Sequence, residues 1–219
     1  SSVMHEVRRL LRQVASSSLT VLITGETGTG KDLAARAVHG ESRRRAGPFV
    51  SVNCAAMPRE LIEAELFGHT RGAFTGAEED RTGLVASASG GTFLFDEIAE
   101  TPPELQAKIL RLIDDRRIRP IGAEEETAVD VRFLFSTSRD LRALTEEGSL
   151  RADLFYRIGS VEVALPPLRE RIEDLPELVE HFRTVAAAGD APRFGEDALR
   201  ALAAHPWPGN VRELRAVVT

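Results

Sequence analysis

A glycine-rich octapeptide, GETGTGKD at residues 25–32, stands between an apolar run and a segment with helical spacing. It fits the pattern G-x-x-x-x-G-K, in which glycines let backbone N–H groups turn around phosphate oxygens. Lys31 is placed to reach β- and γ-phosphates, and the helix that starts there adds the positive end of its dipole. A chance glycine turn is the alternative, but the order of strand, loop, lysine and helix argues against it. We therefore predict nucleotide contacts from Gly25, Glu26, Thr27, Gly28, Thr29, Gly30, Lys31 and Asp32.

A pair of acids follows a later apolar run, FLFDE. The apolar residues hold the strand in a sheet, so its carboxyl end presents Asp96 and Glu97 to the crevice where nucleotides bind in α/β folds. Asp96 suits the coordination shell of Mg²⁺, and Glu97 suits the polarisation of an attacking water molecule. Asp32 stands where a Ser or Thr hydroxyl usually binds Mg²⁺, so we expect it to assist Asp96 only through a water molecule. Many strands end in solvated acids, and only the position after a phosphate loop makes this prediction specific.

Polar residues end two further strands. Asn53 closes VSVN, and Thr137 and Ser138 close FSTS. Asn53 is placed to reach Glu97 from the neighbouring strand. Each residue also has an ordinary alternative, which is turn formation for Asn53 and strand-end polarity for Thr137 and Ser138.

Phosphoryl transfer calls for more positive charge than Lys31 alone provides. LRADLFYRI supplies Arg151 and Arg157 near one face of a helix. That helix follows a strand far along the sheet, so we expect both arginines to reach the nucleotide of a neighbouring subunit rather than their own. Surface salt bridges are the equal alternative. Arg212, one turn into the helix that follows WPGN, is placed to point back at its own nucleotide, with a solvated helical arginine as the alternative.

The elements that position these residues alternate between strand and helix. Buried-strand runs occupy residues 19–25, 48–54, 91–99, 129–138 and 160–168, and helical spacing occupies residues 4–15, 31–39, 58–67, 102–115 and 150–158. This alternation predicts an α/β fold with a central parallel sheet covered by helices on both faces. After PPLRER the spacing is helical throughout. We therefore predict a nucleotide-binding core over residues 1–167 and a small all-α lid over residues 168–219 that lacks its last helix.

Composition narrows the class of protein. With 219 residues, of which 42% are hydrophobic and 28% charged, the chain suits an α/β domain with a small second domain. A net charge of -6 gives no general attraction to nucleic acid, and the single cysteine, Cys54, excludes an intrachain disulfide. No apolar run approaches the roughly 20 residues that span a bilayer, so we expect a cytoplasmic protein without membrane contact. The start at Ser1 and the end at Thr219 inside a helical pattern predict a piece of a longer chain.

One aromatic residue, Phe74, stands in RGAFTGA among residues too small or too polar to cover it. The loop lies within residues 68–82, between the second strand and the acid pair, and Gly72 and Gly76 allow it to rise or lie flat. Two interpretations follow. Either Phe74 folds back onto its own domain, or it is an anchor presented to a partner.

In their order along the chain, these motifs resemble the AAA+ ATPase domain of bacterial enhancer-binding proteins, the activators of sigma-54 RNA polymerase. The resemblance covers nearly the whole chain and rests on GETGTGKD, NCAA, ELFGHTRGAFTGA, GGTFLFDEI, LRADLFYRI, LPPLRERIEDLP and WPGNVREL. The first and fourth motifs are common to P-loop ATPases, whereas GAFTGA is close to diagnostic of this family.

The resemblance implies a P-loop AAA+ core with a helical lid, ATP and Mg²⁺ as ligands, and a hexameric homo-oligomer. It assigns the Walker A lysine to Lys31, the Walker B pair to Asp96 and Glu97, the switch asparagine to Asn53, sensor I to Thr137, the trans-acting arginine fingers to Arg151 and Arg157, and sensor II to Arg212. An acid at Asp32 is usual in the family. Hydrolysis would drive the GAFTGA loop against sigma-54 holoenzyme through Gly72, Ala73, Phe74, Thr75, Gly76 and Ala77.

Some features depart from the family. Sensor I usually reads Thr-Asn, whereas here Thr137 precedes the shorter Ser138, so we expect altered coupling of the γ-phosphate to movement. An N-terminal stretch that helps to seat adenine, the regulatory domain and the helix-turn-helix domain are not in this sequence, so DNA binding is expected only of a parent protein. Two other functions stay open, which are a nucleotide-gated interaction module with little turnover and an AAA+ motor of another branch.

Overall fold

The computed structural model describes residues 1–186 and 194–219. Its centre is a parallel sheet of five strands in the order β2-β5-β8-β1-β9. These strands are β1 (Val21–Thr24), β2 (Phe49–Asn53), β5 (Thr92–Asp96), β8 (Arg132–Thr137) and β9 (Glu162–Ala164). The predicted α/β fold with a parallel sheet is confirmed.

Side chains along the strands alternate between two cores, because successive residues of a strand point to opposite faces of the sheet. Phe95 and Phe135 face one core and stack with their ring centroids 5.1 Å apart, whereas Leu94 and Leu134 face the other core. The first core is covered by α3 (Arg59–Phe67), α4 (Leu84–Ser87), α5 (Pro103–Asp115), α6 (Leu141–Glu146) and α7 (Ala152–Ile158). The second core is covered by α1 (Ser2–Ala15) and α2 (Lys31–Gly40).

The order of the strands decides which polar strand ends meet. Strand β5 lies between β2 and β8, and Asn53 of β2 pairs in register with Asp96 of β5. Because all of these strands run parallel, their carboxyl ends lie along one edge of the sheet. The polar residues that end the buried apolar runs are therefore gathered at that edge.

Two short antiparallel hairpins were not predicted from the sequence. They join β3 (Gly68–His69) to β4 (Arg81–Thr82) and β6 (Arg117–Ile118) to β7 (Thr127–Ala128). The hairpins are linked through Ile121, whose N–H donates to Gly68 O at 2.9 Å and whose carbonyl accepts from the Thr70 N–H at 3.0 Å. Strands of two residues are too short to show a period of two, which explains why the sequence pattern missed them.

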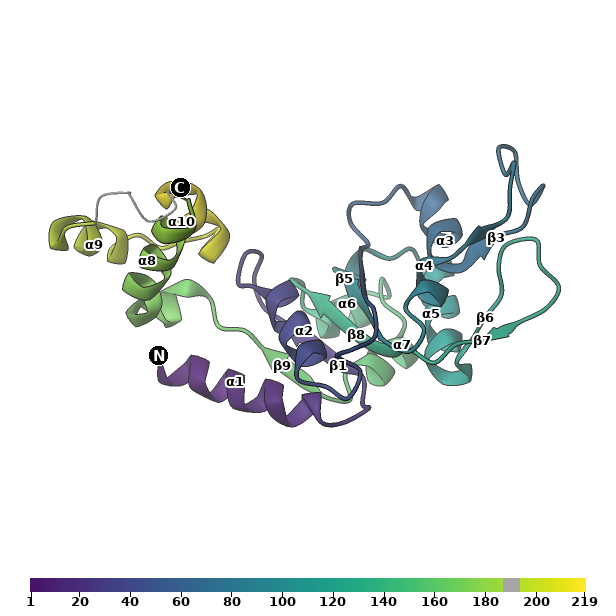
Figure 1. Ribbon diagram of the computed structural model, residues 1–219, viewed down its shortest axis with the longest axis horizontal. Helices are drawn as coiled ribbons and strands as arrows, with labels where there is room; N and C mark the ends of the chain where they lie inside the picture. Colours follow the sequence, from purple (N-terminus) through teal and green to yellow (C-terminus); the bar gives the residue numbers. More distant parts are fainter. Residues whose placement is uncertain (187–193) are drawn as a thin grey trace.

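The lid follows the last strand of the sheet. It contains 3-10 turns at Leu168–Glu170 and Ile172–Asp174 and helices α8 (Leu175–Ala186), α9 (Glu196–Ala203) and α10 (Asn210–Val218). Figure 1 shows the lid helices at one end of the molecule and the two hairpins at the opposite end. The division between core and lid at residue 167 stays a prediction. Among the described residues, no helix has the length and apolar character that a membrane span requires.

Trp207 fills the centre of the lid core. It is 1% exposed and packs in the cluster that includes Leu175 and Leu214, and its Nε1–H donates to Leu202 O at 2.8 Å. We expect Trp207→Ala to lower the free energy of unfolding of the lid by about 3–5 kcal/mol, because it leaves a large cavity. Urea denaturation followed by far-UV circular dichroism measures this loss. Trp207→Phe, which keeps most of the volume, is the control, and equal stability of the two variants would contradict the prediction.

Candidate functional site

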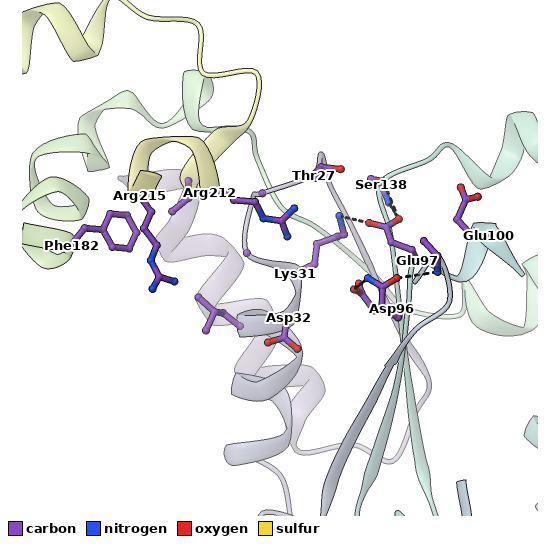
Figure 2. A pocket seen from close by; sticks show the side chains of 16 residues that line it. Thr27, Lys31, Asp32, Asp96, Glu97, Glu100, Ser138, Phe182, Arg212 and Arg215 are labelled. Carbon is purple, nitrogen blue, oxygen red and sulfur yellow. Dashed lines mark hydrogen bonds and ion pairs between the residues drawn. The ribbon is translucent and has the colours of Figure 1, made fainter. Parts of the chain in front are cut away.

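A cavity of about 520 Å³ opens between the carboxyl ends of β2, β5 and β8, the phosphate loop and the lid. Figure 2 shows the charged side chains of the core and of the lid facing one another across this space. The cavity is lined by Thr27, Gly28, Gly30, Lys31, Asp32, Leu33, Asn53, Ala55, Asp96, Glu97, Glu100, Ser138, Phe182, Val211, Arg212 and Arg215. Residues that lie far apart in the sequence thus form one polar site.

The phosphate loop wraps the start of α2. Gly28 has a φ of 84°, and a Cβ on this residue would lie 2.2 Å from the Gly209 carbonyl oxygen, so no other residue fits there. Gly30, with a φ of 104°, precedes Lys31, which is only 7% exposed. The Lys31 ammonium donates to Gly25 O at 2.9 Å and lies 3.2 Å from Glu97 Oε1. The loop therefore holds a buried cation at the floor of the cavity.

Asn53 contacts Asp96 rather than Glu97, which corrects the sequence-based expectation. The Asn53 Nδ2–H donates to Asp96 Oδ2 at 2.8 Å, and the Ser136 hydroxyl donates to Asp96 Oδ1 at 2.5 Å. The reason is the register of β2 and β5, which pairs Asn53 directly with Asp96. The two neighbouring strands thus fix the orientation of the Asp96 carboxylate.

Glu97 lies one residue beyond the strand, in a left-handed conformation with a φ of 54°. Its Oε2 accepts hydrogen bonds from the backbone N–H and the hydroxyl of Ser138, each at 2.9 Å, while Oε1 faces Lys31. Burial raises the pKa of Glu97, but the Ser138 N–H, the Lys31 ammonium and the Ser138 hydroxyl together hold this pKa below its ordinary value. Glu97 is therefore an ionised, oriented carboxylate at the cavity wall.

Side chains at the end of β8 alternate in direction. Ser136 and Ser138 contact the two acids, whereas Thr137 is fully buried and its hydroxyl accepts from the Arg139 N–H at 3.1 Å. Thr137 is not among the residues that line the cavity, and its predicted role as sensor stays a prediction. The sequence reasoning missed Ser136, although a period of two from Ser138 pointed to the same face.

Three of the predicted nucleotide contacts, Gly25, Glu26 and Thr29, do not line the cavity. The Glu26 carboxylate instead forms a bidentate pair with Arg169 of the lid, at 2.6 and 2.9 Å, and also accepts from Asn210 Nδ2 at 3.1 Å. The hydrogen bonds from Arg169 and then Asn210 lower the pKa of Glu26 to about 2. The structure thus assigns the Glu26 side chain a contact with the lid, since the loop is packed against it.

The lid closes one side of the cavity. Arg212 lies one turn into α10, as predicted, and its guanidinium is directed toward Lys31 in Figure 2. Arg215, one turn further along the same helix, also lines the cavity, as does Phe182 of α8. The sequence reasoning did not identify either residue, although the spacing of three between the arginines places both on one helical face.

Arg151 and Arg157 lie outside the cavity that their own chain forms. Arg151 pairs with Asp153 at 2.8 Å and Arg157 pairs with Asp114 at 2.7 Å. The arginine side chains are 48% and 51% exposed, so both are accessible to another molecule. Their action on a neighbouring subunit stays a prediction.

The GAFTGA loop is closed on itself in this structure. The ring of Phe74 meets the ring of His69 edge-on, with centroids 4.9 Å apart, and Phe74 is 39% exposed. Hydrogen bonds from the Gly72 N–H to Ala77 O and from the Ala77 N–H to Phe74 O close the loop on itself. Gly72 and Gly76, with φ values of 82° and 100°, form its two bends. Phe74 therefore contacts its own loop through His69 while its ring stays accessible to another molecule, and its role as an anchor stays a prediction.

Two family models match the chain. The model described as the Sigma-54 interaction domain matches residues 1–164, and the model described as the AAA+ ATPase lid domain matches residues 169–219.

Similar proteins are known from several bacteria. The DNA-binding transcriptional regulator NtrC of Rhizobium meliloti (strain 1021) is 47% identical over 220 residues, which cover 100% of this chain and 46% of that protein. The regulatory protein AtoC of Escherichia coli (strain K12) is 47% identical over 221 residues, which cover 100% of this chain and 48% of that protein. A crystal structure of NtrX from Brucella abortus in complex with ATP is 40% identical with a TM-score of 0.92, and the match covers 100% of this chain and 50% of that one. The chain spans about half the length of these relatives. It belongs to the sigma-54 interaction domain family, the AAA+ domain of bacterial enhancer-binding proteins.

Proposed function

We propose that this chain hydrolyses ATP with Mg²⁺ in a homo-oligomeric ring, and that its parent protein uses this hydrolysis to remodel sigma-54 RNA polymerase holoenzyme. The observation that carries the proposal is the convergence of Lys31, Asp96 and Glu97 in one cavity beside the phosphate loop. The NtrX structure in complex with ATP supports ATP as the ligand. The match to the Sigma-54 interaction domain supports the partner.

Hydrolysis requires a water oxygen to bond to the γ-phosphorus while the bond to the oxygen that bridges the β- and γ-phosphates breaks. Glu97 is placed to orient this water and to accept its proton. Lys31 now faces Glu97 and would exchange that carboxylate for phosphate oxygens when ATP binds. The same exchange frees one oxygen of Glu97 for the water, so binding prepares the carboxylate for its role.

The residues present fit a Mg²⁺ ion. Asp96 lines the cavity, and Asn53 and Ser136 orient its two carboxylate oxygens. Mg²⁺ prefers oxygen ligands and is usually held by one or two carboxylates together with substrate phosphates. The second acid, Asp32, accepts a hydrogen bond from Arg36 at 2.8 Å, which suits a contact through water only. A bound ion would neutralise charge on the phosphates.

Hydrolysis is tested by measuring phosphate release at increasing protein concentrations, with Mg²⁺ and with EDTA. We expect release that depends on Mg²⁺ and a rate per chain that rises with concentration, because arginines from neighbouring subunits complete each site. ATP binding without release by the full-length parent protein at any concentration would favour the nucleotide-gated interaction module instead.

A substitution of Phe74 tests the proposed contact between the GAFTGA loop and sigma-54. We expect Phe74→Ala to weaken capture of sigma-54 about 30-fold or more in the presence of an ATP-hydrolysis analogue, since an exposed aromatic anchor can dominate a small interface. Phosphate release in the absence of sigma-54 should be unchanged, because Phe74 does not line the cavity. Leu61→Ala, on a different exposed apolar side chain, is the control for capture. Equal capture by the Phe74 and Leu61 variants would refute the assignment of the loop.

A substitution of Ser138 tests whether its hydroxyl stabilises the ionised form of Glu97. The Ser138 N–H and hydroxyl are among the groups that hold the pKa of Glu97 below its ordinary value, and they remain in place when Lys31 turns to the phosphates. Hydrolysis should be lost as the pH falls through the pKa that Glu97 has in the ATP complex. Ser138→Ala removes one hydrogen bond to the charged form and should move the acid limb of the pH profile upward by up to about one pH unit. Ser136→Ala, which acts on Asp96, is the control. The prediction fails if the acid limb of Ser138→Ala coincides with that of the unsubstituted chain.

A further inference from the structure

Three successive carbonyl groups of the phosphate loop accept hydrogen bonds from the lid. These bonds run from Asn210 Nδ2 to Thr27 O at 3.1 Å, from Val211 N to Gly28 O at 3.0 Å and from Arg171 Nη2 to Thr29 O at 3.0 Å. In a trans peptide the N–H points away from the carbonyl of the same peptide group. Anchoring these carbonyls to the lid therefore turns the N–H groups of Gly28 and Gly30 to the opposite side, where both residues line the cavity.

Asn210 is the centre of these contacts. It is fully buried at the start of α10, and its Oδ1 accepts from the Leu168 N–H at 2.7 Å. Its Nδ2 donates both of its hydrogens, one to Thr27 O and one to the Glu26 carboxylate, each at 3.1 Å. Only an amide side chain offers two donors and an acceptor in this geometry. Asn210 thus joins the phosphate loop, the first lid turn and α10.

Two further contacts hold the phosphate loop against the lid. Arg169, in the first lid turn, holds the Glu26 carboxylate with two parallel hydrogen bonds. Gly28 lies so close to the Gly209 carbonyl that a Cβ on Gly28 would overlap the carbonyl oxygen. Because of this backbone packing and this bidentate ion pair, the phosphate loop and the start of α10 must move together.

We propose that Asn210, Glu26 and Arg169 form a positioning junction that couples phosphate binding in the loop to the placement of the lid. The junction acts in both directions. It holds the loop in the shape that presents its N–H groups to the phosphates of a nucleoside diphosphate or triphosphate, and it moves the start of α10 when the loop adjusts to them. This inference rests on the proposed nucleotide site, but Asn210, Glu26 and Arg169 are not among the residues that line the cavity.

The test compares the unsubstituted chain with Asn210→Ala by titration calorimetry with MgADP and by amide hydrogen exchange. We expect MgADP to bind the variant about 10-fold or more weakly, since buried partners of the amide are left unsatisfied. In the unsubstituted chain MgADP should slow exchange at the amide of Val211, and in the variant this response should be lost. Unchanged affinity together with an unchanged response at Val211 would overturn the proposal.

A second, milder variant keeps the proposal testable if the fluorescence of Trp207 shows that the lid of Asn210→Ala does not fold. Glu26→Gln keeps the size of the side chain and weakens its pairing with Arg169, and we expect about 3-fold weaker binding of MgADP because the ion pair is half-exposed. Arg200→Gln, which breaks an exposed pair on α9, is the matched control and should bind like the unsubstituted chain.

Amide hydrogen exchange measured without nucleotide tests the junction independently of the proposed nucleotide site. Asn210→Ala should exchange faster than the Arg200→Gln control at Val211 and in the phosphate loop, because the variant loses bonds that hold both segments. If the unsubstituted chain does not bind MgADP, the nucleotide site is refuted, and equal exchange rates in the two variants would refute the junction separately.

Discussion

Glu97→Gln is expected to bind ATP at least as tightly as the unsubstituted chain and to hydrolyse it about 10²- to 10⁴-fold more slowly. Glutamine has nearly the same shape but cannot accept the proton of the attacking water. Glutamine also lacks the negative charge that lies 3.2 Å from the Lys31 ammonium. The phosphates of ATP therefore no longer compete with a carboxylate for Lys31. Single-turnover phosphate release measures the hydrolysis step, and calorimetry with MgATP measures binding.

Glu100→Gln is the matched control for this experiment. Glu100 lines the same cavity, but its carboxylate pairs with Arg139 at 3.3 Å, whereas Glu97 pairs with Lys31. We expect this variant to hydrolyse ATP within a few-fold of the unsubstituted rate. A Glu97→Gln variant that turns over ATP as fast as the Glu100 variant would remove Glu97 from the mechanism.

Arg157→Ala is expected to slow hydrolysis by about 10³- to 10⁵-fold without weakening ATP binding to its own chain, if the arginine is donated to a neighbouring site. The side chain lies outside its own cavity and is half-exposed, so it is available to a second subunit. The decisive measurement mixes Arg157→Ala with Lys31→Ala. Each variant alone should be inactive, whereas the mixture should regain activity, because the Lys31 variant supplies its arginine to the intact site of the Arg157 variant.

The partner of Arg157 provides the control for a purely structural role. Asp114 pairs with Arg157 at 2.7 Å, so Asp114→Asn breaks the same surface salt bridge but leaves the guanidinium in place. Exposed ion pairs contribute only about 0–1 kcal/mol to stability, and the Asp114 variant should remain active. Equal losses of activity in the Asp114 and Arg157 variants, or no recovery in the mixture, would indicate that Arg157 acts only through its surface salt bridge with Asp114. The same pair of experiments applies to Arg151 and Asp153.

The sequence by itself determined the parts of the site that are contiguous. In GETGTGKD the glycines at positions 25, 28 and 30 all have positive φ, and Lys31 starts α2, as the motif requires. The run FLFD forms a buried strand that ends at Asp96. These features are local, because a few neighbouring residues fix both the backbone conformation and the face on which a side chain lies.

Which side chain holds which acid was decided only by the tertiary structure. Asn53 was expected at Glu97 but contacts Asp96, and Ser138, noted in the sequence as a departure from the family, holds Glu97. Both faces of this sheet are buried, so apolar residues do not alternate with polar ones along the central strands, and the sequence does not show which residues of neighbouring strands are paired. The hydrogen-bond partners at the edge of the sheet therefore could not be derived from the motifs.

The packing of the lid on the phosphate loop was likewise not accessible from the sequence. Glu26 belongs to the nucleotide-binding motif, yet its carboxylate contacts Arg169 and Asn210, which are 143 and 184 residues away. A hydrogen bond requires its two heavy atoms to lie within about 3 Å, and only the path of the whole chain brings such distant segments together. The sequence thus determined the chemical groups of the site, whereas the fold decided their partners, because those partners depend on the placement of separate elements in space.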